Sequence, residues 1–62
     1  MPIVHMTMIE GRSFEKKQKM VEAVTDALVA TLEAPRESVR IIINEVPAWH
    51  FAAGGVLKGK PE

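Results

Sequence analysis

One long amphipathic segment between two short β-rich runs most constrains the fold of this chain. Apolar residues recur every three or four positions from Phe14 to Glu33, which predicts a helix of about twenty residues and about 30 Å. Ser13 is a suitable N-cap, and Ala34-Pro35 closes the helix because the residue before a proline is pushed out of helical dihedral angles. The expected apolar stripe consists of Met20, Val21, Val24, Ala27, Leu28, Thr31 and Leu32.

β-branched and apolar residues dominate the runs on both sides of this helix. The run from Pro2 to Ile9 is expected to form a strand, since a proline at the first position of a strand costs no ladder hydrogen bond. The run from Val39 to Val46 is expected to form a second strand, and its Ile41-Ile42-Ile43 is apolar on both faces. This order predicts a βαβ unit whose parallel strands are joined by a right-handed crossover.

The tail after Pro47 has Gly54-Gly55 between two short apolar pieces, which predicts a small hairpin or an arm that reaches a neighbour. We expect residues 1–62 to form a single α/β (α+β) domain. A chain of this length buries only about 60% of the surface that its unfolded form exposes. Two strands and one helix also leave open sheet edges and a bare sheet face, so we expect subunits to assemble into oligomeric sheets.

Composition excludes several other means of stabilisation and several partners. There are no cysteines, and two histidines without an acidic cluster make a poor metal site, so neither disulfides nor a metal are expected. Eight basic and eight acidic side chains cancel, which does not favour nucleic acid or an anionic membrane as a partner. The apolar runs are far shorter than the roughly 20 residues that span a bilayer, and no signal-peptide pattern opens the chain. A cytoplasmic protein is the simplest expectation.

Short motifs along nearly the whole chain carry a resemblance to a known family. They are Met1-Pro2-Ile3, Ile9-Glu10-Gly11-Arg12-Ser13, Ala34-Pro35, Ser38-Val39-Arg40 with Ile42-Ile43, and His50-Phe51 with Gly54-Gly55. With this combination the chain resembles the 4-oxalocrotonate tautomerase family, also called 2-hydroxymuconate tautomerase, of the tautomerase superfamily. The resemblance implies βαβ subunits that pair their sheets into dimers, and a homohexamer of three such dimers. Ala52 stands where such relatives often have glycine, and Trp49 adds bulk nearby.

Carried over by position, the resemblance implies that Pro2 is the general base, that Arg12 and Arg40 are the two site arginines and that Phe51 is the aromatic wall of the pocket. If Met1 is removed, the nitrogen of Pro2 becomes a secondary amine. A free α-amino group has a pKa of about 7.7–8.0, which burial and nearby arginines lower, so a neutral base near physiological pH results. Arg12 could then hold the far carboxylate of a dicarboxylic substrate, and Arg40 the near carboxylate and the charge that develops on oxygen.

Each of these residues also has an ordinary structural explanation. Met-Pro openings are common, and a proline at a strand start has a structural use of its own. Arg12 could be a solvated side chain near a helix start, and Arg40 a solvent-facing residue or half of an interface ion pair. Phe51 could belong to a core or an interface. The two histidines are assigned no role, because a lone histidine on a strand or turn is more often structural or solvated.

The expected function is an isomerase that converts an unsaturated 2-hydroxy or 2-oxo dicarboxylate, such as 2-hydroxymuconate, by proton transfer through Pro2 and without a cofactor. The resemblance implies the degradation of aromatic compounds as its setting. One alternative is a dehalogenase or hydratase, although no Asp or Glu lies between Pro47 and Lys60 to activate water, unless His50 substitutes. Another alternative is a non-catalytic assembly protein, which retention of Met1 would support.

Overall fold

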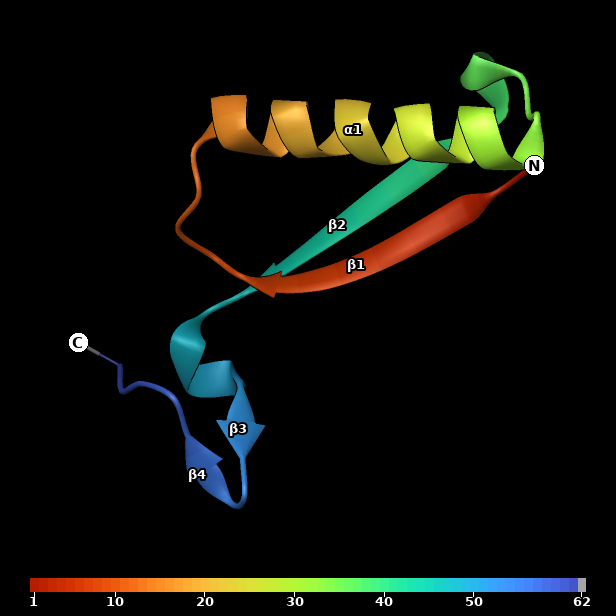
Figure 1. Cartoon of the computed structure of the whole chain (residues 1–62). Coiled ribbons are helices and arrows are strands. Elements are labelled where there is room, and N and C mark those ends of the chain that lie inside the picture. Colours follow the sequence, from red (N-terminus) through yellow and green to blue (C-terminus); the bar gives the residue numbers. More distant parts are fainter. Residues whose placement is uncertain (62) are drawn as a thin grey trace.

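The computed structural model describes residues 1–61 and contains two parallel strands with one helix across one side of them (Figure 1). Strand β1 spans Ile3–Ile9, helix α1 spans Phe14–Leu32 and strand β2 spans Arg40–Val46. The two strands pair in parallel over their full length, from Ile3 opposite Arg40 to Ile9 opposite Val46. The predicted βαβ unit is therefore confirmed, with each strand one residue shorter than expected at its start.

The two ends of α1 follow from their local chemistry. The Ser13 side chain accepts a hydrogen bond from the backbone N–H of Lys16 at 3.2 Å, as expected for the N-cap. The helix ends at Leu32, one residue before the expected end, because Glu33 has a left-handed backbone with φ 55° and acts as the C-cap. Within the part of the chain that the structure describes, no helix combines the length and hydrophobicity needed to cross a membrane.

The tail forms the predicted hairpin. After β2, a short 3₁₀ turn, η2 (Ala48–His50), leads into β3 (Ala52–Ala53), which pairs antiparallel with β4 (Val56–Leu57). Gly54 and Gly55 form the turn with φ values of 60° and 82°, a backbone region that favours glycine. Figure 1 shows that this hairpin projects beyond the carboxyl ends of β1 and β2, away from α1.

The sheet has one face under the helix and one face without any cover. Partly buried side chains alternate with exposed ones along both strands. The bare sheet face consists of Ile3, His5, Thr7, Arg40, Ile42 and Asn44. Ile3 and Ile42 on this face are 55% and 50% exposed, and no side chain among residues 1–61 is fully buried. A monomer of this shape therefore lacks an enclosed core.

The side of α1 that faces the sheet differs in part from the predicted stripe. Ala27, Thr31 and Leu32 are exposed, whereas Lys17, Thr25 and Val29, which were not predicted, are partly buried. Figure 1 shows the strands crossing obliquely under α1. The α1 residues that face the sheet therefore shift around the helix axis along its length, and a fixed helical period predicts the two ends of the apolar stripe wrongly. Lys17 can lie there because its aliphatic stem covers apolar surface while its ammonium group remains paired.

Candidate functional site

Pro2 and Arg40 lie together at the end of the sheet where both strands begin. The backbone N–H of Arg40 donates to the carbonyl of Pro2 at 3.0 Å, which joins the two residues directly. Pro2 is half-buried, whereas Met1 is 80% exposed. Sheet pairing therefore holds Pro2 in place through its own carbonyl, and packing of Met1 contributes little.

The Arg40 guanidinium is tied to the backbone just before it in the chain. Its Nη1 donates to the carbonyl of Glu37 and, more weakly at 3.5 Å, to the carbonyl of Val39. Within residues 1–61, its Nε and Nη2 make no hydrogen bond and no ion pair with a carboxylate. These two nitrogens form one edge of the guanidinium, and such an edge binds a carboxylate with two parallel hydrogen bonds.

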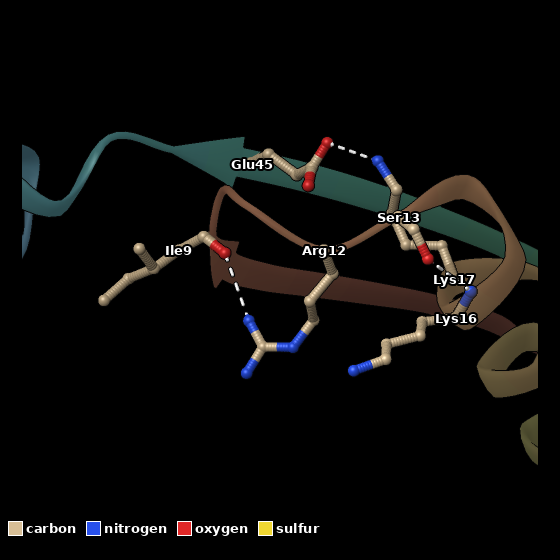
Figure 2. Close-up of polar contacts among 6 residues, drawn as sticks. All are labelled: Ile9, Arg12, Ser13, Lys16, Lys17 and Glu45. Atoms are coloured by element: carbon tan, nitrogen blue, oxygen red, sulfur yellow. Dashed lines mark hydrogen bonds and ion pairs between the residues drawn. The ribbon is translucent and has the colours of Figure 1, made fainter.

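Arg12 is held in a similar way at the other end of the sheet. Its Nη1 donates to the carbonyl of Ile9 at 3.3 Å, three residues earlier, the same offset as between Arg40 and Glu37 (Figure 2). Figure 2 also shows Arg12 pointing away from the nearby carboxylate of Glu45. The third arginine, Arg36, instead forms an ion pair with Asp26. Among residues 1–61, neither of the two predicted site arginines pairs with a carboxylate, so both are held without neutralisation of their charge.

The carboxylate beside Arg12 belongs to Glu45, and it forms an ion pair with Lys17. The Lys17 Nζ lies 2.9 Å from the Glu45 Oε1, and both side chains are about three-quarters buried, with 27% and 28% exposure. Figure 2 shows this pair on the opposite side of the loop from the Arg12 guanidinium. Because Lys17 occupies the carboxylate of Glu45, Arg12 remains available for an external anion.

Phe51 lies beyond the carboxyl end of the sheet, at the start of the hairpin. Its N–H donates to the carbonyl of Ala48 at 3.1 Å, and its carbonyl accepts from the N–H of Lys58 at 2.8 Å. Phe51 is 42% exposed, so the rest of residues 1–61 covers it only in part. Next to it, Trp49 and His50 contact edge to face, with ring centroids 4.1 Å apart.

One subunit does not bring the four predicted site residues together. Pro2 and Arg40 lie where the strands begin, whereas Arg12 and Phe51 follow the ends of β1 and β2. The seven residues of β1 separate the two pairs by roughly 23 Å. A small substrate can therefore contact all four only where two chains meet.

The subunit has a groove, but none of the four candidate site residues lines it. It encloses about 250 Å³ between α1 and β2 and is lined by Phe14, Lys17, Gln18, Val21, Ile43 and Glu45. Neither Pro2 nor either site arginine lines it, and Phe51 is also absent from its walls. The groove of the single subunit is therefore not the candidate active site.

The contacts that hold the two arginines could not be predicted from the sequence. Side-chain bonds to backbone carbonyls have no residue-type signature at the acceptor, because every residue carries a carbonyl. The turn before Arg40 does carry a signal, since proline and serine are both turn residues and a serine hydroxyl can bond the carbonyl three residues before it. Here the Ser38 Oγ donates to the carbonyl of Pro35 at 2.7 Å.

A family model and the named relatives of this chain agree on one family. The model of the family described as "Tautomerase enzyme" matches residues 2–60. A relative from Ralstonia nicotianae, named a probable tautomerase, is 55% identical over 94% of this chain and 83% of its own length. A 2-hydroxymuconate tautomerase of Pseudomonas putida is 43% identical over 97% of this chain and 95% of its own length.

Solved structures agree with this match. A 4-oxalocrotonate tautomerase isozyme from Methylibium petroleiphilum superposes with a TM-score of 0.89 at 42% identity, over 92% of this chain and 89% of that one. A heterohexamer 4-oxalocrotonate tautomerase from Chloroflexus aurantiacus gives 0.89 at 40% identity, over 94% of each chain. Sequence and backbone agree over nearly the full length, so this chain is a member of the tautomerase family and has the fold of the 4-oxalocrotonate tautomerases.

Proposed function

We propose that this protein is a cofactor-independent isomerase that ketonises an unsaturated 2-hydroxy dicarboxylate such as 2-hydroxymuconate, with the amine of Pro2 as general base. The position of Pro2 carries the proposal, because its carbonyl is bonded at 3.0 Å to the backbone of an arginine that keeps one free binding edge. The relative from Pseudomonas putida named 2-hydroxymuconate tautomerase supports this choice of substrate.

The proposed reaction moves one proton and needs no other reactant. With Met1 removed, the neutral amine of Pro2 takes the proton of the substrate's 2-hydroxyl group, and the C–O bond becomes a carbonyl as electrons shift along the diene. The protonated amine then delivers that proton to a carbon of the conjugated chain, which regenerates the neutral amine. Arg40 binds the near carboxylate and stabilises the negative charge on the oxygen, while Arg12 binds the far carboxylate.

This reaction requires an assembly, and we propose a homohexamer built from three dimers. No side chain of residues 1–61 is fully buried, and the bare sheet face exposes half of Ile3 and Ile42 to solvent. A second subunit that covers apolar surface adds the hydrophobic stabilisation that the monomer lacks. The same association supplies Arg12 and Phe51 of one chain to Pro2 of another. The relative from Chloroflexus aurantiacus, described as a heterohexamer, supports assembly.

The test combines intact-mass measurement with an ultraviolet assay of 2-hydroxymuconate ketonisation. Protein whose mass lacks Met1 should catalyse the reaction. Pro2→Ala should lower kcat/KM at least about tenfold, because the alanine keeps a terminal amine but loses the ring that fixes its position, and a positioned base contributes about 10²–10⁴-fold. Pro61→Ala is the matched control, since Pro61 lies in the exposed tail. A correctly processed protein without activity, or Pro2→Ala with undiminished activity, would refute the proposal.

A further inference from the structure

The Arg40 guanidinium is held by two carbonyls, and each belongs to a peptide plane that another hydrogen bond fixes. The peptide between Glu37 and Ser38 presents its carbonyl to Arg40, while its N–H donates to the carbonyl of Pro35 at 2.9 Å. The peptide between Val39 and Arg40 presents its carbonyl to the same guanidinium, while its N–H donates to Pro2. Because a peptide unit is planar, a fixed N–H also fixes the direction of the carbonyl.

Ser38 supplies the additional bond that closes the turn η1 (Arg36–Ser38). Its Oγ donates to the carbonyl of Pro35 at 2.7 Å, on the same oxygen that accepts the Ser38 N–H. Arg36, the first residue of this turn, also pairs with Asp26 of α1 at 2.6 Å, but both side chains are more than half exposed. An exposed ion pair of this kind contributes little, so the serine hydroxyl is the stronger constraint on the turn.

We propose that Ser38 is a positioning residue, whose hydroxyl orients the Arg40 guanidinium toward the substrate through the Glu37 carbonyl. This inference rests on the proposed role of Arg40 in the tautomerase reaction. With Nη1 committed to the two carbonyls, the edge formed by Nε and Nη2 has one preferred direction before substrate arrives. Preorganised donors stabilise developing charge without reorganisation during the reaction, so loss of the Ser38 hydroxyl reduces kcat more than it raises KM.

The test compares Ser38→Ala with Thr31→Val, since the Thr31 hydroxyl makes a bond of the same length, 2.7 Å, to the carbonyl of Ala27 within α1. Ser38→Ala should lower kcat for 2-hydroxymuconate about five- to tenfold, since small misplacements of catalytic groups have effects of this size or larger. Thr31→Val should change kcat less than about twofold, since a surface substitution away from the site has little effect. Ser38→Cys, whose thiol is a poor donor, replaces Ser38→Ala if that variant does not fold.

Measuring Ser38→Ala in a protein that also lacks the Arg40 guanidinium separates a positioning role from an effect on general stability. In Arg40→Ala protein, Ser38→Ala should change kcat less than about twofold, because the group that it orients is gone. If Ser38→Ala matches Thr31→Val, or lowers kcat equally with and without the Arg40 guanidinium, the positioning role is refuted. If Arg40→Ala itself retains wild-type kcat/KM, the proposed role of Arg40 is refuted as well, and this outcome is distinct from the first two.

Discussion

Replacement of Arg12 by alanine tests how the far end of the substrate is bound. The Arg12 Nη1 is committed to the carbonyl of Ile9, which leaves Nε and Nη2 for two hydrogen bonds to a carboxylate. A hydrogen bond to a charged group contributes about 1.5 kcal/mol at the low end, so two contribute about 3 kcal/mol. Arg12→Ala should therefore lower kcat/KM for 2-hydroxymuconate about 100-fold.

Steady-state assays on two substrates check this value. Phenylenolpyruvate has one carboxylate, so its kcat/KM should change less than about threefold in Arg12→Ala, because it lacks the group that Arg12 binds. Arg36→Ala is the matched control, since Arg36 is already paired with Asp26 and should leave both substrates unaffected. Equal losses on the dicarboxylate and the monocarboxylate would show that Arg12 does not recognise a far carboxylate.

Three further substitutions test other parts of the account. Arg40→Ala should lower kcat for 2-hydroxymuconate about 10²–10³-fold, with a smaller change in KM, because it removes charge stabilisation in the transition state; an effect on KM alone would contradict this role. Ile42→Glu places a charge on the bare sheet face and should yield smaller species in sedimentation velocity, whereas Ala30→Glu on the exposed side of α1 should not; an unchanged assembly would exclude this face as an interface. Lys17→Met leaves the partly buried carboxylate of Glu45 without its partner and should lower the free energy of unfolding by about 1 kcal/mol, whereas Lys19→Met should not; equal thermal melting of both variants would contradict this contribution.

The secondary structure was predictable because each element has its own local signal. The two runs of β-branched residues, Ser13 before the helix and Ala34-Pro35 after it identified β1, α1 and β2 to within one residue. The face of α1 was predicted less well. Its contacts depend on the angle at which the helix crosses the sheet, and that angle is a property of tertiary packing which a period of 3.6 residues does not contain.

The candidate site was predictable as a set of residues but not as an arrangement. The resemblance selected Pro2, Arg12, Arg40 and Phe51, and the length of β1 in the structure places Pro2 and Arg12 too far apart to meet in one chain. The carbonyl tethers of the two arginines came only from the structure, because any backbone carbonyl can accept and the choice depends on turn geometry. These tethers occupy Nη1 of each guanidinium, and Nε and Nη2 have no partner within residues 1–61.

The proposed catalysis depends most on the state of the Pro2 nitrogen, which is an amide while Met1 is attached and a basic amine after Met1 is removed. We would treat purified protein that retains Met1 with a methionine aminopeptidase and follow intact mass and 2-hydroxymuconate ketonisation in the same samples. Pro2 is bonded to β2 through its carbonyl, so its placement should not change during the treatment. Ketonisation that rises from background in proportion to the fraction of chains without Met1 is the predicted result. Activity that is already complete while Met1 is attached would contradict the central role of Pro2.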